Sequence, residues 1–235
     1  MASDEERSSK LGDSEPPPDL SPDELALREA ENTLRQYDRL VELIRSSIGT
    51  GRLRLRPSTL MELNRLAVDG LIKSAGAFRH GPIEILGSKH EPPPWQEVAT
   101  LIDDMCEYVN DSLGKSPIHL AAYVMWRLNW IHPFADGNGR TSRAASYYVL
   151  CVGLGQLLPG PRTIPERIAA KKPPYWKALE AADKAWESSE IDVVEMEELL
   201  KGLLAAQLLD VHKLANGEPL DPLPEPPGPA WGGGD

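Results

Sequence analysis

Cysteine is scarce in this sequence of 235 residues, because only Cys106 and Cys151 occur and they lie far apart. Neither forms a CxxC pair, so a disulfide framework and a cysteine zinc site are disfavoured and a reducing compartment is expected. Long apolar runs are also absent. None approaches the roughly 20 residues that a membrane-spanning helix requires. These absences argue against a secreted disulfide scaffold and against a membrane protein.

Basic residues are also fewer than acidic residues. Lysine and arginine number 25 against 36 acidic residues, which gives a formal net charge of −11. Non-specific binding to nucleic acid or to an anionic membrane is therefore disfavoured. The first residues are polar and lack the apolar segment of a signal peptide. The sequence predicts a cytoplasmic protein that binds neither nucleic acid nor membrane.

Apolar residues are sparse at both ends of the chain. Residues 1–20 are polar and include three consecutive prolines, while residues 217–235 contain six prolines and five glycines. Such segments bury too little apolar surface to offset the entropy lost on ordering. We therefore expect a disordered N-terminal tail over 1–20, a helical domain over 21–216 and an extended tail over 217–235.

Helical periodicity dominates between the tails. A capping box at Ser21 and Glu24 starts a first helix, whose apolar face is predicted to include Leu34, Tyr37 and Leu40. A second capping box, at Thr163 and Glu166, starts a short helix. The segment near 118–130 is apolar almost all round, as expected for a central buried helix. Further helices are predicted from about residues 58, 95, 139, 175 and 193. The fold class is all-α.

One segment departs from this periodicity. Residues 76–94 read GAFRHGPIEILGSKHEPPP, with Ile83 and Ile85 on either side of Glu84 and turn-forming residues beyond them. Alternation of this kind predicts a short β-hairpin or an extended flap added to a helical protein.

The loop at 132–143 has the residues for chemistry on phosphates; it reads HPFADGNGRTSR. Pro133 ends one helix, and Gly137 and Gly139 let the backbone turn and present N–H groups at the start of the next. The first N–H groups of a helix form an anion site. Two arginines follow in the first helical turn, where they suit a phosphate-rich ligand better than they suit the helix dipole.

Two further side chains in this loop suggest a metal ligand and a proton acceptor. Asp136 offers the hard oxygen that Mg²⁺ prefers beside nucleotide phosphates. His132 is the side chain of the loop that can exchange a proton near neutral pH. The loop therefore indicates a phosphate site with a base beside it.

The complete loop resembles the signature of the Fic (filamentation induced by cAMP) family, which reads HPFx[D/E]GNGRxxR. The segment before it is similar to the family's flap. The resemblance implies a Fic-type helical bundle with a small β-hairpin flap, and an enzyme that transfers AMP from ATP to a Ser, Thr or Tyr hydroxyl of a target protein.

The resemblance also implies roles for single residues. His132 is expected to be the general base and Asp136 the Mg²⁺ ligand. The nucleotide phosphates would be bound by Gly137, Asn138, Gly139, Arg140 and Arg143. Ile83, Glu84 and Ile85 are expected to align the target as an added strand.

Regulation is open at the level of sequence. Many Fic relatives have an inhibitory helix whose glutamate pairs with the second signature arginine. Glu31, followed by Asn32, fits part of that pattern, but Leu27 stands where a hydroxyl residue belongs. Glu31 is either such an inhibitor or an ordinary acid on an exposed helix face. The resemblance also allows a regulatory partner such as an antitoxin, and an oligomer.

Two other functions remain compatible with the same residues. The site could use a different nucleotide donor, or remove AMP instead of adding it. A non-catalytic nucleotide-binding or interaction module is a third reading, but the intact His132, Asp136 and Arg143 argue against it.

Overall fold

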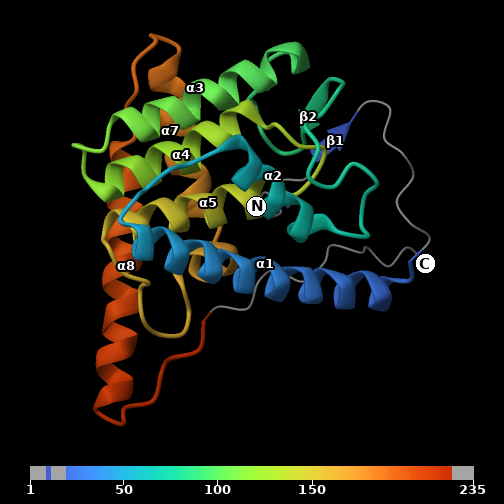
Figure 1. Cartoon of the computed structure of the whole chain (residues 1–235). Coiled ribbons are helices and arrows are strands. Elements are labelled where there is room, and N and C mark those ends of the chain that lie inside the picture. The colour runs from blue at the N-terminus through green and yellow to red at the C-terminus, as the bar shows by residue number, and fades with distance from the viewer. Residues whose placement is uncertain (1–8, 12–19, 224–235) are drawn as a thin grey trace.

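A computed structural model describes residues 9–11 and 20–223 of the chain (Figure 1). The described part is all-α, with a two-stranded sheet and a 3₁₀ turn at Trp95–Glu97. The strands are β1 (Ser9–Leu11) and β2 (Ile83–Ile85). The helices are α1 (Pro22–Thr50), α2 (Pro57–Val68), α3 (Val98–Asp111), α4 (Pro117–Ile131), α5 (Asn138–Gly153), α6 (Ile164–Ala170), α7 (Pro173–Trp186) and α8 (Val194–Ala215).

The centre of the fold is the pair α4 and α5, as the apolar character of α4 predicted. Every residue from Leu120 to Leu128 is buried, including Arg127. Pro133 cannot continue the helix, and α5 starts only five residues later at Asn138. The segment that joins the two central helices is therefore the glycine-rich loop itself.

The other helices cover this pair from several sides (Figure 1). Helices α1 and α2 pack together and both contact α5, while α3 lies along α4. Helices α7 and α8 contact each other and α4, and α6 lies between α5 and α8. The result is a bundle built around α4 and α5.

Both predicted capping boxes are present, at Ser21 with Glu24 and at Thr163 with Glu166. The predicted apolar face of α1 is wrong in part, because Leu34 is 66% exposed and Tyr37 is 40% exposed.

The buried face of α1 instead includes two side-chain amides. Asn32 and Gln36 are buried and donate to the carbonyl oxygens of Asp69 and Leu63, each at 2.9 Å. A polar side chain can be buried where its N–H donors find acceptors, and apolar periodicity does not detect that case. Leu40 and Ile44 continue this face into the core.

The flap at residues 76–94 contains one strand, β2, at the predicted position 83–85. The predicted hairpin is not formed within this segment, because β2 pairs antiparallel with β1 instead. A strand needs a partner for its N–H and C=O groups, and here the partner comes from the opposite end of the sequence. A separate bridge joins Phe78 of the flap to Phe134 of the loop.

This pairing also corrects the prediction for the N-terminal tail, since residues 9–11 form a strand inside the segment predicted to be disordered. Residues 1–8 and 12–19 lie outside the described residues, as do residues 224–235 of the predicted C-terminal tail. Residues 218–223 of that tail contain no helix or strand.

The structure bears on two expectations from the sequence, one about disulfides and one about membrane-spanning helices. Cys106 and Cys151 are both buried, and neither forms a disulfide. Over the described ranges 9–11 and 20–223, no helix combines the length and the apolarity that crossing a bilayer demands.

Candidate active site

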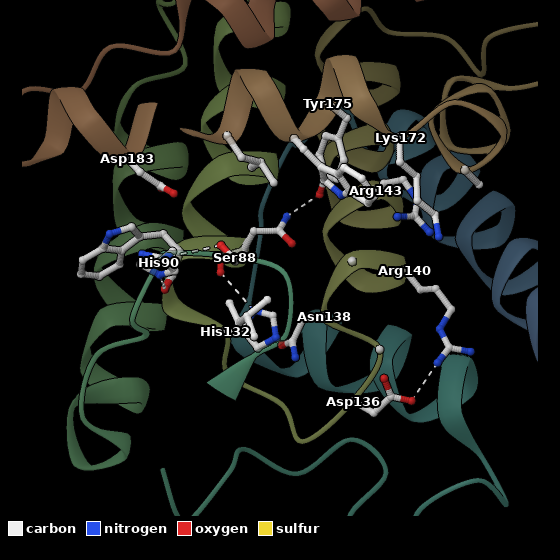
Figure 2. A pocket seen from close by; sticks show the side chains of 18 of the residues that line it. Ser88, His90, His132, Asp136, Asn138, Arg140, Arg143, Lys172, Tyr175 and Asp183 are labelled. Atoms are coloured by element: carbon white, nitrogen blue, oxygen red, sulfur yellow. Dashed lines mark hydrogen bonds and ion pairs between the residues drawn. The ribbon is translucent and has the colours of Figure 1, made fainter. Parts of the chain in front are cut away.

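A cavity of about 680 Å³ opens beside the loop that joins α4 to α5. Its walls come from α1, the flap, the end of α4, the start of α5, and α7. Figure 2 shows His132, Asp136 and Arg140 around this one space, with Arg143 drawn beside Tyr175 and Lys172. Most of the predicted site residues therefore lie in one cavity: His132, Asp136, Gly137, Asn138, Gly139, Arg140 and Arg143.

The loop has a conformation that requires glycine at position 137. Gly137 has a φ of 76°, in the left-handed region, and it is the N-cap of α5. A Cβ atom there would lie 2.7 Å from Cγ1 of Val68 and 3.0 Å from Nδ2 of Asn64. Both the backbone angle and the close approach to α2 therefore exclude a side chain.

Asn138 holds the loop closed with its side chain. Its Oδ1 accepts from the N–H of Phe134 at 2.9 Å, and its Nδ2 donates to the carbonyl of Phe134 at 2.8 Å. Phe134 is fully buried, and its ring lies 5.5 Å from that of Phe78. The amide of Asn138 is therefore occupied within the loop, and Asn138 can contact a phosphate only through its backbone N–H.

The start of α5 provides an anion site. The first intrahelical bond runs from the N–H of Thr141 to the carbonyl of Gly137, at 2.9 Å. The N–H groups of Asn138, Gly139 and Arg140 precede that bond, and no side chain caps this helix end. Free N–H groups and the helix dipole together favour an anion at this point of the cavity.

The two arginines differ in their surroundings. Arg140 donates to Oδ2 of Asp136 at 2.9 Å and to the carbonyl of Ala67 at 3.1 Å. Arg143 is half-buried and, within the described residues, has no carboxylate partner. Burial lowers the pKa of the Arg143 guanidinium. Because an arginine stays charged in proteins, an anion entering the cavity is the partner that would best match Arg143.

Asp136 fits the role of a magnesium ligand. Its side chain is 43% exposed at the cavity wall, and Arg140 contacts its Oδ2 oxygen. Mg²⁺ bound with nucleotides typically takes only one or two carboxylates and completes its shell with water and phosphate oxygens. A single accessible carboxylate beside an anion site is therefore sufficient for that ion.

His132 is held in an unusual backbone position with its ring inside the cavity wall. It caps α4 in the left-handed region, with φ 51° and ψ 59°, and it is 6% exposed. Its Nδ1 lies 3.2 Å from the carbonyl of Asn129. A carbonyl can only accept, so Nδ1 is the protonated nitrogen and Nε2 has the lone pair.

The protonation state of His132 follows from its surroundings. Burial lowers the pKa of the imidazole to about 4, although the bond to Asn129 opposes that shift. The ring is therefore neutral at physiological pH. A neutral imidazole at the cavity wall can accept a proton from a hydroxyl, and the lowered pKa makes it a weaker base than a free histidine.

Arg79, which the sequence analysis did not single out, connects the flap to His132. This buried guanidinium donates from Nε to the carbonyl of His132 at 2.8 Å and from an Nη atom to that of Ile131 at 3.3 Å. It also donates to the carbonyls of Gly81, at 3.1 Å, and of Pro93, at the two ends of the flap. One side chain thus joins the end of α4 to both ends of the flap.

Asn64 is a second missed residue, because it joins α2 to the same loop. Its Nδ2 donates to the carbonyl of Asp136 at 2.8 Å, and its Oδ1 accepts from the N–H of Gly76 at 3.0 Å. Only the spatial neighbourhood identifies Arg79 and Asn64; neither has a motif or spacing in the sequence that could have revealed them.

Aromatic residues form the far wall of the cavity. Tyr175 and Trp176, on α7, both line it, together with Trp130 at the end of α4. The hydroxyl of Tyr175 accepts from Nδ2 of Asn129 at 2.7 Å, which ties α7 to the helix that ends in His132. His90 of the flap donates from Nε2 to the carbonyl of Trp130 at 2.8 Å. The sequence indicated Tyr175 and Trp176 as core residues or as the edge of an adenine pocket, Trp130 as a packing residue, and His90 as an ordinary polar residue of the flap.

The flap reaches the cavity through one of its three predicted residues. Ile85 lines the cavity, whereas Ile83 and Glu84 do not. Ser88 and His90, further along the flap, also line it.

Helix α1 reaches the cavity through residues other than the predicted Glu31. Glu29 and Thr33 line it, and Oε1 of Glu29 lies 3.8 Å from a guanidinium nitrogen of Arg140. The carboxylate of Glu31 lies 3.7 Å from Arg28 and is 52% exposed.

Comparison with known proteins bears directly on this loop. Residues 54–150, which include the loop and the flap, match the model of the Fic/DOC family. Over these residues the chain is similar to a Fic domain. Curated relatives include the protein adenylyltransferases Fic of Drosophila persimilis and Drosophila willistoni, each 32% identical over 117 residues. That alignment covers 48% of this chain and 22% of each relative, so the chain spans under a quarter of their length.

Solved structures show the same fold. A Fic domain-containing signaling protein from Bacteroides thetaiotaomicron superposes with a TM-score of 0.66 at 22% identity, over 83% of this chain and 76% of that one. Fic-1 of C. elegans gives a TM-score of 0.63 at 19% identity, over 86% and 55%. The Fic-type helical bundle predicted from the signature is therefore confirmed.

Proposed function

We propose that the chain transfers AMP from ATP to a Ser, Thr or Tyr hydroxyl of a protein. The observation that supports this most directly is that one cavity is lined by a neutral His132, by the start of α5, and by Arg143, which has no carboxylate partner among the described residues. The matched relatives named protein adenylyltransferase support the same class of reaction.

Each residue has a part in positioning the reactants. The N–H groups at the start of α5 bind the phosphate chain, Arg140 contacts it from the side of Asp136, and Arg143 binds its far end. Asp136 would hold Mg²⁺, and the bound ion would neutralise negative charge on the phosphates. Most of the acceleration then comes from alignment and from preorganised positive charge.

His132 takes the proton in this scheme. The acceptor oxygen bonds to the α-phosphorus of ATP as its proton passes to Nε2 of His132. The bond from that phosphorus to the oxygen bridging to the β-phosphate breaks, and pyrophosphate leaves. Because Nδ1–H is held by the carbonyl of Asn129, the ring is already oriented with Nε2 as the acceptor.

Substitution of His132 tests the proposal. Purified wild-type protein and His132→Ala are incubated with ATP labelled on the α-phosphate, with Mg²⁺ and a cell lysate. We expect protein labelling to fall by about 10²–10⁴-fold in the variant, as is typical for loss of a general base. ATP binding and the thermal unfolding midpoint are measured in parallel, because a variant that still binds ATP isolates the chemical step.

Two outcomes would contradict the proposal. Wild-type labelling by His132→Ala would remove His132 from the mechanism. Labelling of wild type with UTP, GTP or a phosphocholine nucleotide, but not with ATP, would assign a different donor to the same site.

We further propose that α1 restrains the activity, as the resemblance suggested, but through Glu29. The Glu29 carboxylate is the acidic group of α1 at the cavity wall, where it competes with phosphate oxygens for Arg140. Glu31 remains the alternative drawn from the sequence pattern.

A further inference from the structure

The start of α7 brings a further cation to the cavity. Lys172 is the N-cap of α7, and it lines the cavity together with Ala169 before it and Tyr175 after it. Figure 2 shows Lys172 beside Arg143, at a distance from Asp136 and Arg140. No motif in the sequence indicates Lys172, because a lysine before two prolines has no spacing typical of a ligand.

The packing of α7 on α5 explains this position. The hydroxyl of Tyr175 lies 3.3 Å from Oγ of Ser142, the residue that precedes Arg143. This contact holds the first turn of α7 against the first turn of α5. Lys172 already has helical backbone angles, with φ −74° and ψ −33°. Residues three apart in a helix lie on the same face, so Lys172 is on the face of α7 that Tyr175 turns toward α5.

The helix itself does not favour a cation at this point. Positive charge near a helix N-terminus opposes the helix dipole. Pro173 and Pro174 occupy the first two positions of α7 and have no N–H group to offer. An anion at this helix end would therefore be bound mainly by the side chain of Lys172, next to the guanidinium of Arg143.

We propose that Lys172 binds the terminal phosphate of the donor together with Arg143, and that the two cations select a donor whose terminal phosphate is not esterified. This inference rests on the proposed function, because it concerns the donor of the same reaction. A phosphate group with one ester link has a charge of about −1.5 to −2 at pH 7, which two cations can balance.

The leaving group explains why this pair would be selective. When the acceptor oxygen bonds to the α-phosphorus, the bond to the bridging oxygen breaks and pyrophosphate leaves with its full charge facing Lys172 and Arg143. A nucleoside diphosphate esterified with choline would instead direct a quaternary ammonium at the two cations. Repulsion of that kind discriminates between donors as effectively as attraction does.

Calorimetry of the full chain with Mg²⁺ tests the contact without any transfer reaction. Lys172→Met removes the charge and keeps most of the aliphatic chain. Its affinity for ATP and for inorganic pyrophosphate should fall by about tenfold or more, as expected for loss of one charge-assisted hydrogen bond. Its affinity for AMP should be unchanged, because AMP has no phosphate at that end.

Two further variants distinguish the charge from the packing. Lys172→Arg keeps the charge and should retain most of the ATP affinity. Lys171→Met changes an exposed neighbour that does not line the cavity, and it should bind all three ligands as wild type does. Weaker ATP binding in Lys171→Met, equal to that in Lys172→Met, would contradict a specific contact.

A double variant tests whether one phosphate is shared. Arg143→Ala combined with Lys172→Met should lose less ATP affinity than the product of the two single losses, because groups that bind one ligand atom cluster act as a unit. Losses that multiply would show that the two cations bind at separate places.

A donor assay completes the test. Wild type should transfer from ATP in preference to the choline-esterified diphosphate, and Lys172→Met should narrow that preference. ATP binding by Lys172→Met equal to that of wild type overturns the role of Lys172 and leaves the transferase intact. Binding that depends on Lys172, in a protein that labels no target, supports the contact and overturns the proposed function. Absence of ATP binding in wild type overturns both.

Discussion

Arg143 is a cation in the cavity wall that has no carboxylate partner in the part of the chain that the structure describes. One turn earlier, Arg140 already has Asp136 as a partner at 2.9 Å. This difference predicts that Arg143 is the arginine whose charge a nucleotide satisfies. A guanidinium that binds the far end of a phosphate chain should distinguish ATP from ADP.

Calorimetry with ATP and ADP measures this difference. Wild type should bind ATP more tightly than ADP, and Arg143→Ala should bring the two affinities within about threefold of each other, because a charge-assisted contact contributes about 1.5–3 kcal/mol.

Asp136→Ala should weaken ATP binding in the presence of Mg²⁺ but not in EDTA. Arg39→Ala, which removes a surface pair with Glu62, is the matched control. Unchanged affinities in both site variants would place the nucleotide elsewhere.

For single residues, the sequence identified those site residues that lie next to one another in the chain. The signature loop runs over 132–143 without interruption, so its glycines, acid and base could be read together. Arg79 contacts His132 across 53 positions of sequence, and nothing in the composition of the flap indicates that contact. Asn138 was expected to bind phosphate, whereas its amide is occupied by Phe134.

Among the elements, the flap and α4 are connected through Arg79. Substituting Arg79 by Gln leaves the last carbonyls of α4 and the two ends of the flap without their shared donor. We expect the turnover number to fall by about 10²-fold, as a displacement of about 1 Å at a reacting centre can cost that much. The KM for ATP should change much less, because the phosphate site at α5 is not touched.

An NMR titration of His132 separates this positioning role from a general loss of stability. The charge of Arg79 contributes to the lowered pKa of His132. In Arg79→Gln that pKa should therefore rise, and in Arg79→Lys, which keeps the charge, it should rise less. Lys89→Gln, an exposed flap cation, is the control. A variant with normal turnover would show that the flap does not depend on this side chain.

The prediction about regulation concerns Glu29 of helix α1. Glu29→Gln removes the charge near Arg140, so self-labelling and target labelling should rise several-fold at an ATP concentration below KM. Glu31→Gln changes an exposed carboxylate on the same turn and should leave the rate unchanged. A rise in Glu31→Gln alone would return the inhibitory role to the residue that the sequence pattern favoured. Equal activity in all three proteins would make α1 a purely structural helix.

The element boundaries were largely predictable, because caps and prolines act locally. The starts at Ser21 and Thr163 depend on a serine or threonine with a glutamate three residues later. Which face of α1 is buried was not predictable, since Asn32 and Gln36 donate hydrogen bonds to the carbonyls of Asp69, the C-cap of α2, and of Leu63 within α2. The partner of β2 was also missed, because the pairing between residues 9–11 and 83–85 joins segments that are far apart in the sequence.

The stability of the whole molecule should depend on the titration of His132. The unfolded chain binds a proton at this residue with a pKa near 6.5, and the folded chain only below a pKa of about 4. Between these values the unfolded state holds more protons, so stability decreases as the pH falls from about 6.5 to about 4. The stabilisation is fully present above pH 6.5, and its loss amounts to about 3 kcal/mol at 1.36 kcal/mol per pKa unit.

Urea unfolding at a series of pH values, from 7.5 to about 4.5, checks this dependence against His132→Asn. Asparagine tolerates the left-handed backbone of position 132 and does not titrate. The free energy of unfolding should fall more steeply for wild type than for the variant over this range. Parallel curves would show that the folded and unfolded states bind the His132 proton equally.

The loop between α4 and α5 also limits how a protein of this shape can diversify. The same few residues hold His132, close around Phe134 and join two deeply buried helices. An insertion there would have to displace α4 from α5, so this turn has little freedom to change its length. The flap is anchored to the core through Phe78, Arg79 and His90, whereas β2 pairs with β1 at the outside of the bundle. New specificities should therefore arise by changes in those peripheral segments, while the turn itself keeps a constant length.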